Sequence, residues 1–309
     1  MALFSLIFFK IISILLSIII GFLAGKIAKV GSEDISNLLF YFIAPIVFFS
    51  VPASASLDYS SLSLSIITFF IASFLSIFSF YFFRIYWSDH TLNIIAYSAG
   101  AANTGYFMLP IASTLFDNYT LSLYMMAAVG VSLYDCSIGY YMCMRNISST
   151  KDSVLRLLKM PTLISFALGC AFSLSGLRLP DFLEDFIYNM RAAYSVLGMV
   201  IIGLGLSTMK KFTIDKKFTL ALCSAKFIFY PIAINLFILA DRFFLHWFDS
   251  SAYYALQLIS TAPIAANTMV MAGLLKFPQE KVATSLLLSL GIALIYIPLI
   301  SSILFENLE

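Results

Sequence analysis

Ala101-Ala102-Asn103-Thr104 and Ala265-Ala266-Asn267-Thr268 repeat the same four letters, AANT, within one chain. Each copy lies in a charge-free apolar segment, 91–116 or 250–275, that is long enough to cross a bilayer. Helix-breaking residues crowd both copies, namely Gly100, Gly105 and Pro110 around the first and Pro263 and Gly273 around the second. Two interrupted helices at matching places in the two halves of a chain are typical of the substrate site of a transporter.

The composition around these segments is that of a membrane protein. Of 309 residues, 61% are hydrophobic and only 11% are charged, whereas a soluble domain carries roughly 25% charged residues. We therefore predict an all-α polytopic protein in a lipid bilayer, with no nucleic-acid partner. Because no H-E-x-x-H, P-loop or G-x-S-x-G motif occurs, we expect neither an enzyme nor a cofactor or metal site. The four cysteines lie in apolar segments without metal-ligand spacing.

The charged residues divide the chain into predicted spans. There are ten, at about 3–24, 35–56, 61–83, 91–116, 120–144, 160–177, 186–208, 217–240, 251–275 and 281–304. Thirteen lysines and arginines fall in the loops after the odd-numbered spans, but only Arg178 and Arg242 fall in the alternate loops. Because cytoplasmic loops are rich in Lys and Arg, we expect the odd loops in the cytoplasm and both termini outside.

The predicted spans fall into two groups of five. The longest cytoplasmic loop, about 145–159, separates residues 1–145 from residues 146–309. Since five is odd, the second group enters the membrane with the opposite orientation. A shift of 164 residues, which superposes Asn103 on Asn267, also places span four on span nine and span five on span ten. This pattern predicts two inverted five-helix repeats, as in many secondary transporters.

The two interrupted spans are suited to an anion. If each breaks near its asparagine, a half-helix begins near the middle of the bilayer, with about +0.5 charge and unpaired N–H donors. Two such starts favour a carboxylate. Freed carbonyl and Asn oxygens could instead hold sodium, but more oxygen ligands are needed than these segments supply. The predicted substrate-binding residues are Asn103, Thr104, Gly105, Pro110, Pro263, Asn267 and Thr268.

Four ionisable side chains fall within the predicted spans: Lys10, Asp135, Arg191 and Lys226. Charges there are costly and are functional hypotheses by default. Asp135 shares a small polar helix face with Ala128 and Ser132, so it is expected to face protein. Two interpretations stay open, a structural Asp135–Lys226 ion pair, or a proton-coupling Asp135 with Lys226 as its partner or as counter-charge to the anion. Lys10 and Arg191 are expected to snorkel or to pair locally.

Several motifs together resemble a known family. Asn103-Thr104-Gly105 with Pro110 resembles the N-T-G…P signature of the auxin efflux carrier family, and Pro263 with Ala265-Ala266-Asn267 resembles its second crossing segment. Lys159-Met160-Pro161, Gly169 and Leu179-Pro180 are similar to its sixth span and the turn that follows. Two positions depart from the pattern. Met108 replaces a frequent glycine, and span seven lacks a proline near Ser195.

The resemblance implies a secondary carrier of small organic anions, such as auxin-like carboxylates, malonate or malate. It implies a scaffold from spans 1, 2, 6 and 7 and a mobile transport domain from spans 3–5 and 8–10, with broken spans four and nine crossing at the substrate. Elevator-like alternating access and homodimers are also implied. The short 145–159 loop is similar to that of bacterial permeases, which predicts a bacterial inner membrane.

Two other functions remain open on the sequence. One is a sodium-coupled symporter of organic anions similar to the bile acid symporters, which share the ten-span architecture. The other is a sensor that keeps the fold without net transport. Substrate identity, direction of transport and the coupling ion, H⁺ or Na⁺, stay undetermined by the sequence.

Overall fold

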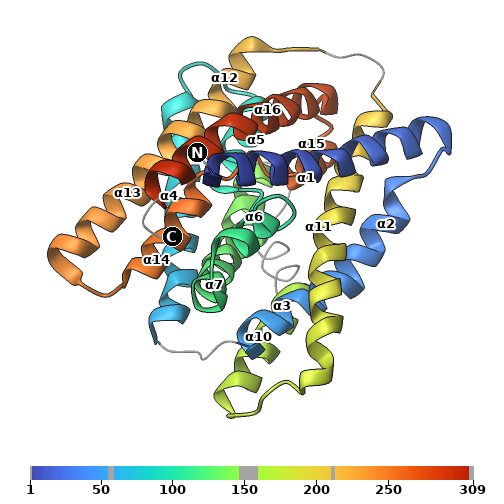
Figure 1. Cartoon of the computed structure of the whole chain (residues 1–309). Helices are drawn as coiled ribbons and strands as arrows, with labels where there is room; N and C mark the ends of the chain where they lie inside the picture. The colour runs from blue at the N-terminus through green and yellow to red at the C-terminus, as the bar shows by residue number, and fades with distance from the viewer. Residues whose placement is uncertain (1, 55–58, 146–158, 210–212, 306–309) are drawn as a thin grey trace.

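The computed structural model describes residues 2–54, 59–145, 159–209 and 213–305, and no strand occurs in these ranges. Its α-helices are α1 (Ala2–Ile27), α2 (Ser32–Leu38), α3 (Ala44–Ser54), α4 (Tyr59–Phe83), α5 (His90–Gly100), α6 (Met108–Leu115), α7 (Asn118–Tyr134), α8 (Tyr140–Met144), α10 (Pro161–Leu174), α11 (Glu184–Ser207), α12 (Lys216–Ser224), α13 (Tyr230–Ala240), α14 (Ser250–Ser260), α15 (Asn267–Leu274) and α16 (Gln279–Leu304). Figure 1 shows their arrangement.

Short irregular helices join several of these elements. Four are π-helical, η1 (Leu39–Ile43), η2 (Asp135–Gly139), η4 (Ala225–Phe229) and η5 (Asp241–Leu245), and η3 (Asp181–Leu183) is a 3₁₀ turn. Each π segment lies within or at the end of a long helix, so that helix continues through it. Such π segments are frequent at functional sites, and η2 begins with Asp135 while η4 contains Lys226.

Seven stretches of the described chain are long and apolar enough to cross a membrane. They are Leu3–Ile27, Ser32–Ser54, Leu62–Phe83, Asn118–Met144, Asp181–Ser207, Lys216–Leu245 and Gln279–Leu304. The protein is therefore an all-α integral membrane protein, as its composition predicts. These stretches coincide with seven of the ten expected spans. The sixth expected span contains only the 14-residue α10, and the fourth and ninth are each divided into two short helices.

The predicted end of the eighth span is wrong. The helix does not stop at residue 240 but continues through η5 to Leu245, so that Asp241 lies inside it. Asp241 is fully buried. Its burial is tolerated because its carboxylate accepts hydrogen bonds from the backbone N–H groups of Trp247 and Phe248 and from the Tyr253 hydroxyl. A charged residue satisfied in this way does not end a helix. The expected cytoplasmic loop at 145–159 lies, except for its two ends, outside the described residues.

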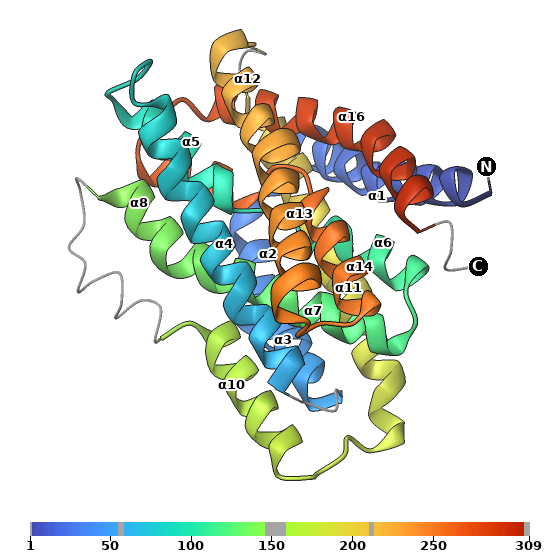
Figure 2. The same cartoon turned by 90° about the vertical axis from the view of Figure 1, so that its left-hand side faces the viewer.

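In Figure 1, α1 runs from the centre to the right and packs against α11, and α3 packs against α10 in the lower part. Figure 2, turned by 90°, shows α1 beside α16 as well. Glycines permit the closest approach. A side chain at Gly203 of α11 would collide with the backbone carbonyl of Ile18, and one at Gly21 of α1 with that of Val200. Small residues at crossings are a common means of packing helices in membranes.

We expect Gly203→Ala to destabilise the protein, because the added methyl group meets a backbone oxygen that cannot move alone. Overpacking of this kind costs about 1–3 kcal/mol, which a thermal-unfolding midpoint in detergent can measure. Gly291→Ala is the matched control, since a methyl group at this helical glycine enters open space and should leave the midpoint unchanged or slightly raised. Equal midpoints for the two variants would contradict the close α1–α11 packing.

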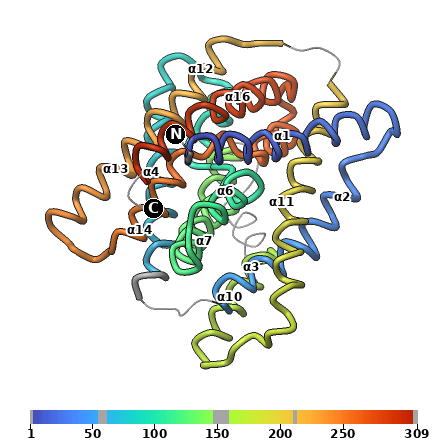
Figure 3. Tube along the Cα trace, in the orientation of Figure 1, coloured from blue at the N-terminus to red at the C-terminus, as the bar shows by residue number. Residues whose placement is uncertain are grey.

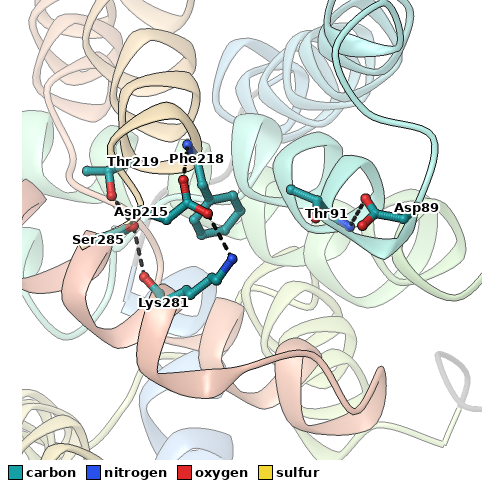
Figure 4. Close-up of polar contacts among 7 residues, drawn as sticks. All are labelled: Asp89, Thr91, Asp215, Phe218, Thr219, Lys281 and Ser285. Atoms are coloured by element: carbon teal, nitrogen blue, oxygen red, sulfur yellow. Dashed lines mark hydrogen bonds and ion pairs between the residues drawn. The ribbon is translucent and has the colours of Figure 1, made fainter. Parts of the chain in front are cut away.

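An ion pair joins the first turns of α12 and α16, as Figure 4 shows. Asp215 caps α12 by accepting a hydrogen bond from the Phe218 N–H at 3.2 Å, and its other oxygen lies 2.8 Å from Lys281 Nζ. A 2.8 Å hydrogen bond between Thr219 and Ser285 supports the same contact. The hydrogen bond from Lys281 lowers the pKa of Asp215 below its usual value, and partial burial opposes this only in part.

Lys281→Met is expected to lower stability by less than about 1 kcal/mol at pH 7, because both groups are partly exposed. A carboxyl group whose pKa is lowered in the folded protein stabilises it above the ordinary pKa of about 3.9. The difference between wild type and variant should therefore vanish as the pH falls and Asp215 becomes protonated. Unfolding midpoints between pH 7 and pH 3 measure this. Lys276→Met, at an exposed lysine outside the ion pair, controls for loss of charge.

Candidate functional site

Both AANT copies lie where a helix is interrupted. The first segment runs as α5 to Gly100 and resumes as α6 at Met108, and the second runs as α14 to Ser260 and resumes as α15 at Asn267. The break that the sequence predicts beside each asparagine is therefore present. Figure 3 traces the chain through α6 and α7 in the centre of the molecule, with α14 to their left.

The two interruptions pair with each other. The structure forms an antiparallel bridge between Ala102 and Ile264, and the Asn103 N–H donates to the Pro263 carbonyl at 3.1 Å. Backbone groups released by a helix break at membrane depth must find partners within the protein. Here the first segment supplies a donor to a carbonyl of the second, although 160 residues of chain separate the two. The two broken helices thus meet at one point inside the protein.

Asn103 holds the start of α6. Its side-chain oxygen accepts a hydrogen bond from the Phe107 N–H at 3.2 Å, and its carbonyl accepts one from the Met108 N–H at 3.2 Å. The amide oxygen is thereby committed to the helix, while the amide nitrogen is buried with no partner among the described residues. The Tyr124 hydroxyl donates to the Thr104 carbonyl at 2.6 Å and ties the same loop to α7.

A cavity of about 80 Å³ lies at the meeting point, which is room for several water molecules or a small solute. Its lining comes from five parts of the chain: Val47, Phe48 and Val51 of α3; Ala102, Asn103, Thr104, Gly105, Tyr106 and Leu109 of the first broken segment; Tyr124, Met125, Ala128, Val129, Ser132 and Asp135 of α7 and η2; Tyr194 of α11; and Ala265, Ala266 and Asn267 of the second broken segment. We call the α3 residues and Tyr194 the apolar wall, and Asn103, Thr104, Asn267 and Asp135 the polar wall.

Asp135 reaches the cavity from the helix beside it. It is 9% exposed and accepts a hydrogen bond from the Asn267 side-chain nitrogen at 3.3 Å through one oxygen. Its other oxygen is buried without a partner among the described residues. Ala128 and Ser132 line the cavity from the same helix face. The prediction that this face points into the protein is confirmed.

Lys226 is not the ion-pair partner of Asp135. It is 1% exposed and acts on Asp135 electrostatically, but no Lys226 nitrogen lies within 4.0 Å of an Asp135 oxygen. Its ammonium group lies 3.8 Å from the centre of the Tyr230 ring and has no hydrogen-bond partner among the described residues. A direct structural ion pair, one of the two interpretations drawn from the sequence, is therefore absent.

A scan against protein-family models matches none of them, and a search of curated proteins finds no match for the chain. The resemblance to the auxin efflux carriers therefore rests on the sequence motifs alone.

The structure divides the seven predicted substrate-binding residues into two groups. Asn103, Thr104, Gly105 and Asn267 line it, but Pro110, Pro263 and Thr268 do not. Pro110 lies in the first turn of α6, and Pro263 acts through its carbonyl at the crossing. Thr268 is fully buried one residue beyond Asn267. Nor is there, among the described residues, a group of three or more His, Cys, Asp or Glu side chains that could hold a metal ion.

Tyr106 and Tyr194 form an aromatic contact that sequence reasoning missed. Their ring centres are 4.8 Å apart, and the Ser195 hydroxyl donates to the Tyr106 carbonyl at 2.5 Å. This contact fastens the first broken segment to α11. A proline at position 195 could not donate this bond. No spacing in the sequence pairs residues 106 and 194, because only the packing of α11 against the crossing brings them together.

Proposed function

We propose that the protein is a secondary transporter of small organic anions, with its substrate bound in the cavity where the two broken helices cross. The observation that carries this proposal is the backbone pairing of the two AANT segments beside a cavity lined by both asparagines. Discontinuous helices of this kind form substrate sites in many transporter folds.

The polar wall favours a carboxylate. The helices α6 and α15 both begin at the crossing, and a helix start carries about half a positive charge. The unpartnered Asn103 amide nitrogen adds a donor. In a buried cavity, donors without partners gain most from a charged acceptor. Asn103 is therefore the main donor to the substrate, Asn267 binds beside it at the start of α15, and Thr104 and Gly105 shape the wall next to them.

The apolar wall favours a substrate with an apolar body. Val47, Phe48 and Val51 of α3 face the crossing together with Tyr194 of α11. No lysine, arginine or histidine is among the lining residues, so a second carboxylate would find no cation there. We therefore favour carboxylates with an apolar body over dicarboxylates such as malate or malonate.

The helix packing is consistent with two inverted repeats. In that arrangement α1 corresponds to α10, and α3 corresponds to α11. The repeat therefore maps the observed pair α1–α11 onto the observed pair α10–α3. The cavity lies between α3 and α11 on one side and the crossing on the other. This position suits an elevator in which the crossing moves past a scaffold, as the resemblance to auxin efflux carriers implies, with the scaffold forming a homodimer.

Proton coupling is the form of energy supply that we propose. Asp135 is a carboxylic acid in the substrate cavity, and one of its oxygens has no hydrogen-bond partner among the described residues. A transported proton needs a group that gains and loses it within the membrane, and intramembrane acids serve this role in transporters.

Binding and uptake measurements test the proposal. Purified protein is screened with a series of small carboxylates by thermal unfolding, because a ligand that binds the native state raises apparent stability. The best ligand is then followed into liposomes with and without a pH gradient. We expect a stabilising carboxylate whose uptake depends on the gradient. Binding without uptake would favour a sensor, uptake driven by sodium alone would favour a symporter, and no binding by any carboxylate would contradict the proposal.

A further inference from the structure

The charged groups around the cavity do not balance. Asp135 is the one acidic residue in the lining, and the lining contains no lysine, arginine or histidine. The Asp135 side chain is nine-tenths buried, and the oxygen that Asn267 does not bond has no partner in the described part of the chain. A buried carboxylate without a cation in direct contact is costly. A simple carboxylate entering the cavity would add a second negative charge.

Lys226 does not remove this imbalance. Its ammonium group lies against the Tyr230 ring, is not within ion-pair distance of Asp135 and does not reach the cavity wall. Since Asp135 lines the cavity and no cation of the described residues lies within ion-pair distance of it, its carboxylate is left for a cationic group that enters with the substrate.

The helix ends at the crossing provide for both signs of charge. The helices α6 and α15 begin there, while α5 ends at Gly100 and α14 ends at Ser260. Helix starts favour negative groups and helix ends favour positive groups. Asn103 supplies an unpartnered amide donor to the same cavity, and Asp135 supplies an unpartnered carboxylate oxygen. The polar wall therefore has one group complementary to a carboxylate and one complementary to an ammonium group.

We propose that the substrate is a zwitterion of the α-amino acid class, with a carboxylate, an ammonium group and an apolar side chain. The proposal rests on the proposed function and specifies its substrate. The substrate carboxylate binds at Asn103 and the helix starts, and its ammonium group binds Asp135. Its apolar side chain packs against Val47, Phe48 and Val51 of α3. When the cavity is empty, a proton can occupy Asp135 in place of the ammonium group.

Three ligands of matched shape test this assignment. L-valine carries both charged groups, 3-methylbutanoate lacks the ammonium group, and isobutylamine lacks the carboxylate. Dissociation constants are measured by thermal unfolding or calorimetry in sodium-free buffer at pH 7. We expect valine to bind about ten- to a hundredfold more tightly than either analogue, as one charge-assisted hydrogen bond would provide.

Two variants connect the preference to Asp135. In Asp135→Asn, valine should lose its advantage over 3-methylbutanoate, while binding of 3-methylbutanoate is retained or improved. Asp249→Asn removes an exposed carboxylate that caps α14 outside the cavity, and it should keep the wild-type preference.

Each outcome separates this inference from the proposed function. Equal or tighter binding of 3-methylbutanoate to wild type would overturn the zwitterion assignment and leave the carboxylate carrier standing. Tightest binding of isobutylamine would overturn both, since the cavity would then select a cation. A valine preference that persists in Asp135→Asn would also overturn the assignment of the ammonium site.

Discussion

Asp135→Asn is expected to abolish pH-driven uptake, to the level of liposomes without protein, while the variant still folds and binds simple carboxylates. Asparagine keeps the shape of the side chain and can still pair with Asn267, but it cannot take up or release a proton. The measurement is substrate uptake into liposomes with an imposed pH gradient, beside equilibrium binding to the purified variant. Loss of uptake with retained binding separates coupling from recognition.

The position of Lys226 sharpens this prediction. In a direct ion pair, Asp135→Asn would strand the lysine, and adding Lys226→Met would restore stability and transport. No such pair is present, so the double variant is expected to remain without pH-driven uptake. Asp249→Asn serves as a charge-matched control. Restored coupling in the double variant would mean that Asp135 is only a structural partner.

Asn103→Asp is expected to weaken carboxylate binding by roughly a hundredfold or more, since it replaces a hydrogen-bond donor with a negative charge. The change keeps an oxygen that can accept from the Phe107 N–H and thus cap α6. Asn103→Ala is the comparison, because it removes the donor and the cap together. We expect a smaller loss of binding, about ten- to a hundredfold, with a lower unfolding midpoint.

Thermal unfolding and ligand titration on both variants measure the two effects separately. Asn267→Ala should also weaken binding, because it removes a side-chain donor at the start of α15 in the cavity lining. Wild-type affinity in Asn103→Asp and Asn267→Ala alike would place the substrate away from the crossing, whatever their stability.

Local features of the sequence are sufficient to predict the membrane class, the approximate positions of most helices and both helix breaks. A long apolar run must form a helix in a bilayer, because every backbone N–H and C=O needs a partner. Glycine and proline beside each AANT copy interrupt that pattern locally. Charged residues predict the ends of the membrane spans less reliably, as Asp241 demonstrates. Its carboxylate is satisfied by groups up to 12 residues away, which no hydropathy pattern reveals.

The choice of side chains that line the cavity was decided only by the tertiary structure. Most faces of these helices are apolar, so periodicity does not distinguish the face of α3 that carries Phe48, or the face of α11 that carries Tyr194, from faces turned to lipid. The crossing of the two broken segments selects them, since it fixes which distant helices pack against it.

The same crossing determines which polar groups in the site pair with one another. The sequence alone identified Asn103, Asn267 and Asp135 as candidates, because polar residues in a bilayer are rare and costly. It could not assign Asn103 Oδ1 to the Phe107 N–H or Asn267 Nδ2 to Asp135, nor separate Lys226 from Asp135. The bond within the first broken segment depends on the exact shape of its loop. The other two relations depend on distances between segments about 90 to 130 residues apart in the chain, which only long-range packing can set.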